Sequence, residues 1–294
     1  MKDGFGIYYF SDGGRYVGIS KNDKKEGYGI DYYPNRDKYK GNYKNNKQDG
    51  YGILYLANGM IYEGEFNNDY LEGYVIVNYM NGKYEGQFKN FKREGIGTFI
   101  DHNGNKFECE FKNDKKEGYG FAYFSDGNKY IGEFKNNMKD GFGIYYYPSG
   151  GRYIGMYKNN MKDGNGIIYY PNGDKYKGNF KKDNYEGYGI VHCSNGDIYE
   201  GDHKNNMKHG NGIVYFPNGD RYEGEFINGI FNGDGAFYSH LGIQVKSYFK
   251  EVFSTKIFLL VYKIILVLNL YSGLIKNKMT LLLLIILIIG ILIN

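Results

Sequence analysis

"KNNMKDGFGIYYYPSGGRYIG" occupies residues 135–155, and residues 158–178 read "KNNMKDGNGIIYYPNGDKYKG". A paired-glycine element, G-x-G in most units, begins eleven times in the chain, and every step is 23 residues except one of 22. The first glycines of these elements are Gly4, Gly27, Gly50, Gly73, Gly95, Gly118, Gly141, Gly164, Gly187, Gly210 and Gly233. A second element, Y-x-G, follows in phase. A fixed period of this length identifies a repeat protein in which each unit is one supersecondary element.

Each unit has the pattern of a β-hairpin. The paired glycines and the apolar residues after them form the first strand, and Y-x-G-x-F forms the second. All four prolines fall at the turn between them: Pro34, Pro148, Pro171 and Pro217. The loop 171–173 fits a type I turn with glycine in the left-handed conformation. This register predicts Ile168 opposite Tyr176 and Gly166 opposite Gly178.

The glycines at fixed offsets predict a strip on which an aromatic ring lies flat against the backbone, because glycine has no Cβ to hold the ring away. The 22-residue step has a local cause, since Asn81-Gly82 is followed by one residue before the repeat tyrosine. We expect a two-residue turn there that pairs Tyr84 with Tyr79 and keeps the same side chains on the same face.

Stacked hairpins of this kind predict an all-β fold, an extended single-layer antiparallel ribbon. In seven units the residue between the paired glycines is aromatic and is expected on the face opposite the repeat tyrosines. These residues are Phe5, Tyr28, Tyr51, Tyr74, Tyr119, Phe142 and Tyr188. Exposed aromatic rows usually mark an interaction surface. We therefore predict that this face binds other proteins. A homodimer formed by this chain is an open alternative.

The segments "YEGEF" at Tyr62, "YIGEF" at Tyr130 and "DGFGIYYYPSGGRYIG" at Asp140 resemble MORN repeats (membrane occupation and recognition nexus) over residues 1–238. The tryptophan usual in that family after Y-x-G-x is replaced by Phe66, Phe88, Phe111, Phe134, Phe180, Phe226, Tyr43, Tyr157 and His203. Other departures are Val75 for a glycine, Cys109 for the glycine of Y-x-G, and Arg36 for the turn glycine. The resemblance implies binding and scaffolding without catalysis by the repeats themselves, and phosphoinositide binding is often proposed for the family.

Two basic rows are candidate contacts for anionic phospholipid. The first precedes the repeat tyrosine: Arg15, Lys38, Lys83, Lys106, Lys129, Arg152, Lys175 and Arg221. The second is expected in the loops that join units: Lys44, Lys47, Lys89, Lys92, Arg93, Lys112, Lys115, Lys116, Lys135, Lys139, Lys158, Lys162, Lys204 and Lys208. One interpretation is a ladder of contacts to lipid phosphates, each worth about 1 kcal/mol near a charged surface. The other, which we favour, is that these side chains keep a long ribbon soluble and its edges unpaired.

Other chemistry is not indicated. The net charge of +4 among 70 charged residues gives no case for nucleic-acid binding. The G-x-G pairs recur throughout and precede no helix, so they do not predict a nucleotide or other cofactor site. The histidines are scattered and form no metal-ligand pattern, and no catalytic group stands out. Cys109 and Cys193 lie four units apart, too far to bridge, which favours a reducing compartment.

The composition changes after Tyr238. Residues 239–256 are expected to form a cap and linker, and residues 257–293 one or two hydrophobic membrane helices. The stretch 257–275 has the length of a spanning helix, and 279–293 is short for one. A helical hairpin is one arrangement; in another the first stretch lies in the interface and the second inserts. Lysines before the first stretch favour an array that faces the cytoplasm.

These features predict a membrane-anchored scaffold, with repeats first and anchor last as in junctophilin-like proteins, whose array binds protein partners and, in the lipid interpretation, anionic phospholipid. The alternative is a regulatory appendage or fragment of a phosphatidylinositol phosphate kinase-like lipid kinase or a lysine methyltransferase. No catalytic domain follows the repeats in this sequence, so the chain is not expected to be an enzyme.

Overall fold

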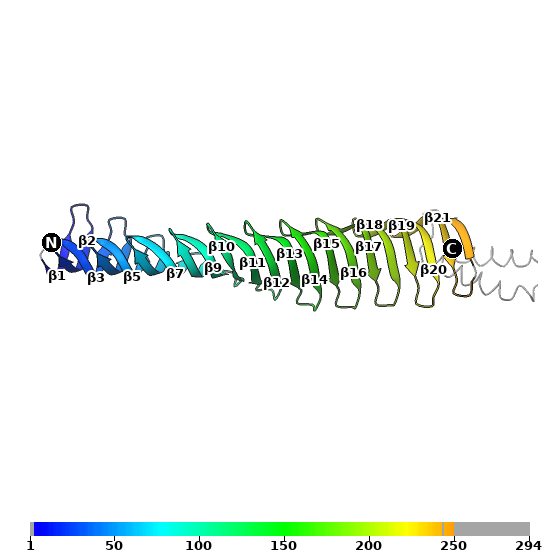
Figure 1. Ribbon diagram of the computed structural model, residues 1–294, viewed down its shortest axis with the longest axis horizontal. Helices are drawn as coiled ribbons and strands as arrows, with labels where there is room; N and C mark the ends of the chain where they lie inside the picture. Colours follow the sequence, from blue (N-terminus) through cyan, green and yellow to red (C-terminus); the bar gives the residue numbers. More distant parts are fainter. Residues whose placement is uncertain (1–2, 243, 250–294) are drawn as a thin grey trace, which may run out of the picture. The chain divides into compact units, whose positions relative to one another are not determined.

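The structure, a computed structural model, describes residues 3–242 and 244–249. The chain divides into two compact units, Met1–Lys162 (unit 1) and Asp163–Asn294 (unit 2). Each unit is an open antiparallel sheet one layer thick, whose consecutive strands pair in chain order (Figure 1). The described residues of both units contain strands and turns and no helix. The predicted all-β, single-layer hairpin sheet is therefore confirmed for each unit.

The strands follow the repeat. Those of unit 1 are β1 (Gly4–Tyr9), β2 (Arg15–Lys21), β3 (Lys24–Tyr32), β4 (Lys38–Lys44), β5 (Lys47–Tyr55), β6 (Ile61–Asn67), β7 (Tyr70–Tyr79), β8 (Gly82–Lys89), β9 (Lys92–Asp101), β10 (Lys106–Lys112), β11 (Lys115–Tyr123), β12 (Lys129–Lys135), β13 (Met138–Tyr146) and β14 (Arg152–Lys158). β15 (Met161–Tyr169) begins just before the unit boundary, and unit 2 continues with β16 (Lys175–Lys181), β17 (Asn184–His192), β18 (Ile198–Lys204), β19 (Met207–Tyr215), β20 (Arg221–Ile227), β21 (Ile230–Tyr238) and β22 (Gln244–Phe249).

The hairpin register is the predicted one. In β15 and β16, Ile168 pairs with Tyr176 and Gly166 with Gly178. Across the loop the Tyr170 amide donates to the Asp174 carbonyl at 2.9 Å, and the Gly173 amide donates to the Tyr170 carbonyl at 3.0 Å. Gly173 has a φ of 92°, the left-handed conformation that a side chain would resist. Proline and glycine in this loop therefore fix the register of the hairpin.

The repeat tyrosines lie flat over glycines, as the spacing predicts. Tyr130 on β12 is fully buried, and its hydroxyl donates to the Glu133 carbonyl at 2.8 Å. A Cβ added to Gly143 would lie only 2.4 Å from Cε2 of the Tyr130 ring. Tyr16, Tyr39, Tyr84, Tyr176, Tyr199 and Tyr222 make the same arrangement with their own glycines. Tyr62 does not, since Val75 stands in place of the second glycine and lies over Gly64. We call the side of the sheet that carries these rings the core face, and the opposite side the outer face.

The segment that joins two consecutive repeats is a tight turn and not the expected loop. Asn136 and Asn137 both have positive φ, 49° and 70°, and the strand pairing resumes at once with Lys135 opposite Met138. Asparagine tolerates this conformation, and two such residues in succession make a type I′ hairpin turn. Between this turn and Gly143 the register shifts, so that residues 140–142 lie opposite Glu133 alone. The first glycine of the pair, Gly141, lies in this bulge with a φ of 108°.

The 22-residue unit has a different register from the predicted one. Tyr84 pairs with Val77, Tyr79 pairs with Gly82, and the turn is formed by residues 80–81. The predicted pairing of Tyr84 with Tyr79 is therefore wrong by two residues. The turn lies one residue earlier than expected, so Gly82 belongs to β8. Because the register differs by an even number of residues, Tyr84 still lies on the core face.

Adjacent hairpins are also tied by side chains of the turns. Oδ1 of Asn137 accepts the backbone amide of Lys116, 21 residues earlier, at 2.9 Å. The same contact is made by Asn46, Asp69, Asp114, Asn160 and Asn206. At Phe91 the turn residue has a φ of 59° and no side-chain acceptor. The series of hydrogen bonds from backbone amides to turn side chains is therefore interrupted in the 22-residue repeat.

The core face is built from rings that meet edge to face. In unit 1 the Tyr39 ring centroid lies 5.2 Å from that of Tyr43 and 5.0 Å from that of Phe66. In unit 2, Tyr199, Val214, Tyr222, Phe226, Phe231 and Phe237 form one buried cluster. Edge-to-face geometry is preferred by aromatic pairs, and it lets a single-layer sheet bury large side chains on one side.

The predicted C-terminal hydrophobic helices, residues 257–293, lie outside the described residues. Part of the predicted linker 239–256 forms the strand β22, which pairs with β21. Within residues 3–242 and 244–249, no helix has the length and apolar character that a membrane span needs.

Candidate functional site

The outer face carries all seven aromatic residues predicted between the paired glycines. Their side chains are exposed, from 47% for Phe142 to 77% for Phe5. Six lie in unit 1, and Tyr188 lies in unit 2. A single-layer sheet covers one face only, so these rings lie in solvent, where large apolar groups usually mark contact surfaces.

Two of the seven rings also make polar contacts within the sheet. The hydroxyl of Tyr51 donates to the Glu63 carboxylate, and that of Tyr188 donates to Glu200. The hydrogen bond to Glu63 raises the pKa of the Tyr51 hydroxyl, as the bond to Glu200 raises that of Tyr188. Both rings are thereby oriented on the outer face.

The predicted basic row lies along the outer face, and part of it is paired with glutamate. Lys83 contacts Glu85, Lys106 contacts Glu108, and the Arg221 Nε lies 2.6 Å from Glu223. Each glutamate follows its cation by two positions and so points to the same face of the same strand. In these units the positive charge is balanced locally.

Tyrosines alternate with these cations across the strands, which the sequence analysis missed. Arg15 pairs in register with Tyr32, Lys38 with Tyr55, and Arg221 with Tyr238. The cations lie over the rings at 4.1, 4.1 and 4.2 Å from the centroids. Lys175 lies 5.4 Å from the ring centroid of Tyr169. The signal in the sequence was the tyrosine that ends the first strand of most units, whose cross-strand neighbour is the basic residue.

Five of the cations predicted in connecting loops lie on the core face instead. The Lys139 Nζ is 4.5 Å from the Tyr145 ring centroid and 5.0 Å from that of Tyr157. The others are Arg93, Lys116, Lys162 and Lys208, each over one or more rings. Burial lowers the pKa of Lys116 and of Lys208. The interpretation of these five as solvent or lipid contacts is wrong, because the tight turn begins the next strand earlier and turns every second side chain inward.

The same position is filled by rings or by an aliphatic side chain in other units. Tyr185 stacks on Tyr176 at 3.6 Å between centroids, and Phe231 stacks on Tyr222 at 3.8 Å. Leu71 is fully buried there. Since a lysine stem, a phenyl ring and a leucine are interchangeable at this place, its task is to cover the repeat tyrosine.

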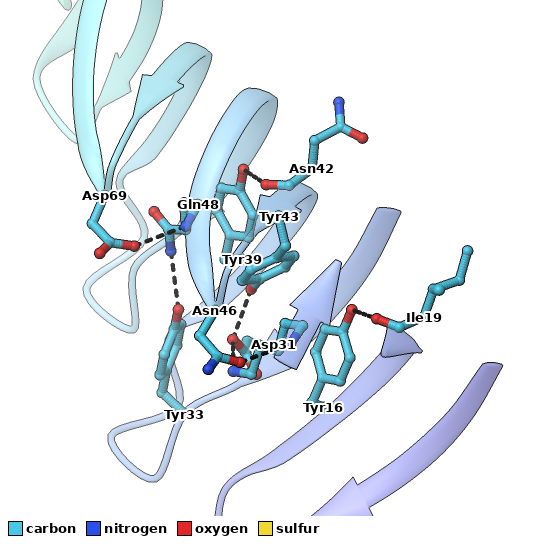
Figure 2. A network of polar contacts seen from close by, with 11 residues as sticks. Tyr16, Ile19, Asp31, Tyr33, Tyr39, Asn42, Tyr43, Asn46, Gln48 and Asp69 are labelled. Carbon is cyan, nitrogen blue, oxygen red and sulfur yellow. Dashed lines mark hydrogen bonds and ion pairs between the residues drawn. The ribbon is translucent and has the colours of Figure 1, made fainter. Parts of the chain in front are cut away.

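In one repeat a carboxylate, Asp31, takes the place of an apolar residue on the core face. Asp31 is buried, and it accepts hydrogen bonds from Lys25 Nζ and from the Tyr43 hydroxyl, the latter at 2.7 Å (Figure 2). Beside it the Gln48 side-chain amide donates to the Tyr33 hydroxyl at 3.0 Å (Figure 2). The carboxylate has two partners, so the cluster is a satisfied structural network on the core face.

No group of histidine, cysteine and carboxylate side chains within the described residues is arranged to hold a metal ion. Burial raises the pKa of the Cys109 thiol to about 12, which keeps it protonated. His203 takes a core position between the rings of Tyr176 and Tyr199, both at 5.1 Å. The chemically notable side chains of the core face are thus used in packing, and the accessible groups are those of the outer face.

The MORN repeat family model matches the chain in eleven stretches. They are residues 1–15, 16–38, 39–61, 62–74, 84–106, 108–129, 130–152, 153–175, 176–198, 199–221 and 222–239. Together they span most of the chain. A full stretch such as 130–152 begins at a repeat tyrosine and holds the second strand of one hairpin, β12, and the first strand of the next, β13. No curated protein matches the chain in sequence.

Solved structures with some likeness include the TCP domain of SAS-4 from Drosophila melanogaster, in complex with a proline-rich motif of Ana2. It is 18% identical with a TM-score of 0.35, over 54% of this chain and 91% of that domain. Virginiamycin B lyase from Staphylococcus aureus is 10% identical with a TM-score of 0.14, over 84% of each chain. Superpositions this weak carry no argument about fold or function.

Proposed function

Because the chain belongs to the MORN repeat family, we propose that it is a non-catalytic, membrane-anchored scaffold whose repeat array binds protein partners through the outer face. The observation that carries the proposal is the asymmetry of the sheet. The core face is covered by the chain's own tyrosines and phenylalanines, whereas the outer face leaves a row of aromatic rings such as Tyr28, Tyr74 and Tyr119 exposed. An exposed row of this kind suits recognition of a partner better than solubility.

The membrane part of the proposal rests on the sequence of residues 257–293. An apolar stretch of 19 residues at 257–275 reaches the length of a spanning helix, which needs about 17 to 25 residues. In this arrangement the array faces the cytoplasm.

Carbonate extraction of membranes tests the anchor. We expect the full chain to stay in the membrane pellet and a 1–250 truncation to move to the supernatant, because only the first retains the apolar stretches. If both leave the pellet equally, the anchor is wrong while the binding role of the array stands untouched.

A second ligand class for the outer face is anionic phospholipid, through cations of the predicted basic row. Lys129, Arg152 and Lys175 are the candidates, since the residues two positions later are Ile131, Ile154 and Lys177 and no glutamate follows them there. Reversing these three charges should reduce binding to anionic vesicles if they contact lipid phosphates. Unchanged vesicle binding would mean that the row serves only to keep the sheet soluble.

A further inference from the structure

The outer face of β11–β14 differs from that of the preceding strands β6–β10. One residue of each strand is aligned across the four strands by the register, Phe121 with Ile131, Ile131 with Ile144, and Ile144 with Ile154. In β6, β8 and β10 the same row holds glutamates, namely Glu63, Glu85 and Glu108. Four apolar side chains therefore follow one another in this row, whereas from β6 to β10 every second strand carries a glutamate.

A second row lies beside the first and combines cations with tyrosines. Lys129 pairs in register with both Tyr123 and Tyr146, and Arg152 pairs with Tyr146. No carboxylate stands in either row on these strands. Two carboxylates border the rows on this face: Glu108 on β10 pairs in register with Phe121, and Glu133 on β12 accepts the backbone amide of Phe142 at 3.0 Å. We call these two rows, residues 121, 131, 144, 154, 123, 129, 146 and 152, the β11–β14 patch.

A depression adjoins the patch over β11–β13. Its volume is about 530 Å³, and it is lined by Phe121, Tyr123, Lys129, Ile131 and Tyr146 of the patch together with Gly127, Tyr130 and Tyr147. Its floor is apolar and aromatic, and a lysine stands at its side. A depression of this composition fits one large apolar side chain next to a negative charge.

We propose that the β11–β14 patch binds an extended acidic peptide segment of a partner protein, in which a large apolar residue is followed two positions later by aspartate or glutamate. The two rows are two residues apart along each strand, which is about 7 Å, and an extended peptide places its residues i and i+2 at the same spacing. The apolar side chain then fills the depression, and the carboxylate lies between Lys129 and Arg152. This inference rests on the proposed partner-binding role of the outer face and names the partner's chemistry.

A peptide fits the patch better than a bilayer surface does. The patch is about 15 Å wide from β11 to β14, three strand spacings. A planar anionic membrane laid on it would also meet Glu108 on β10 and the exposed Glu133. A segment that lies along the strands contacts the cations with its carboxylate and is kept away from Glu108, and it stays clear of Glu133 when its contact ends over Ile131, two positions before that glutamate.

Fluorescence anisotropy tests the proposal with the full chain in a neutral detergent. The probe is a short fluorescein-labelled peptide in which phenylalanine and glutamate alternate at every second position, with serine between them. We expect saturable binding to the wild type and at least about tenfold weaker binding to Lys129→Glu/Arg152→Glu, because two attractive contacts become repulsive. The control Lys38→Glu/Lys83→Glu makes the same charge change on the same outer-face row, on β4 and β8 outside the patch, and should alter binding less than about twofold.

Two further arms separate the alternatives. A peptide with lysine for glutamate should bind at least about tenfold more weakly. Ile131→Ser, checked for folding by circular dichroism, should weaken binding of the glutamate peptide at least about fivefold, because Ile131 lines the depression. The proposal is overturned if both double variants weaken binding equally, or if the lysine peptide binds as tightly as the glutamate peptide.

It is also overturned in favour of a lipid headgroup if Lys129→Glu/Arg152→Glu abolishes binding to phosphatidylserine vesicles and leaves peptide binding intact. Membrane anchoring is read separately in all arms from flotation of the full chain with phosphatidylcholine liposomes. The peptide inference and the anchor can therefore fail independently.

Discussion

At the scale of the residue, the contact between a tyrosine ring and a bare backbone carries the fold. Tyr130 can reach the Glu133 carbonyl only because Gly132 and Gly143 present no Cβ beneath its ring. The ring then supplies the apolar surface that a second layer would supply in a sandwich. Glycine is required at these positions for space, whereas at Gly141 and Gly150 it is required for a positive φ.

Gly143→Ala should therefore destabilise the protein by about 1–3 kcal/mol, since a methyl group 2.4 Å from the Tyr130 ring must displace it. The midpoint of urea unfolding, followed by circular dichroism, measures the change. The matched control is Phe142→Thr at the next position, an exposed outer-face residue, which should change stability by less than about 0.5 kcal/mol. Equal effects of the two substitutions would mean that the ring does not need the bare backbone.

His203 makes the stability of unit 2 depend on pH. Burial among the rings of Tyr176, Tyr185 and Tyr199, with the Lys208 charge nearby, lowers its pKa below the usual 6.5, although Asp202 opposes the shift. As the pH falls below 6.5 the unfolded chain takes up the proton before the folded one does, so stability present above pH 6.5 is lost toward lower pH.

The measurement is the free energy of unfolding at pH 7.5 and at pH 5, compared between the wild type and His203→Phe. Phenylalanine occupies the equivalent place in other units, as at Phe180 and Phe226. The variant should lose the part of the pH dependence that His203 contributes. Identical pH profiles of wild type and variant would show that the imidazole is protonated equally well in the folded state.

At the scale of the element, the hairpins are held in line by the asparagines and aspartates of the turns. Asn137 serves twice, because it adopts a positive φ of 70° and accepts the Lys116 amide. Phe91 does neither well, since a bulky residue at a φ of 59° is strained and its ring accepts no backbone hydrogen bond. Its ring contacts Tyr62 with centroids 6.2 Å apart, which compensates in part.

Replacing Phe91 by asparagine should stabilise the protein by about 1 kcal/mol, through relief of strain and a restored acceptor. The reciprocal change, Asn137→Phe, should destabilise it by about 1–2 kcal/mol for the same reasons. Thermal unfolding of the two variants against the wild type checks both signs. A loss of stability in Phe91→Asn would show that the contact with Tyr62 outweighs the turn.

Sequence alone predicted the hairpin, its register and the glycine strip, because proline, glycine and tyrosine in this unit act locally. It failed for the 22-residue repeat, where the turn lies at residues 80–81 and Gly82, the glycine expected in the turn, pairs with Tyr79. It also failed for Lys139, since a lysine after two asparagines has the composition of a loop. The inward direction of that side chain follows only from the tight turn at residues 136–137. The tyrosines beside the outer-face cations can be placed only once the cross-strand pairing is known.

At the scale of the whole molecule, the proposal joins two properties that lie in different parts of the chain. Residues 257–293 supply the apolar stretches expected to hold a membrane, and the outer face of unit 1 supplies the exposed rings and the β11–β14 patch. A scaffold needs both at once, because a partner bound by the array must be carried by the same chain that is held at the bilayer.

Flotation with phosphatidylcholine liposomes tests this claim most directly. The full chain should rise with the liposomes and carry the phenylalanine–glutamate peptide with it. The 1–250 truncation should bind the peptide and remain in the dense fraction, and Lys129→Glu/Arg152→Glu should rise without the peptide. A full chain that stays in the dense fraction, or that rises and leaves the peptide behind, would contradict the account of this protein as a membrane-anchored scaffold.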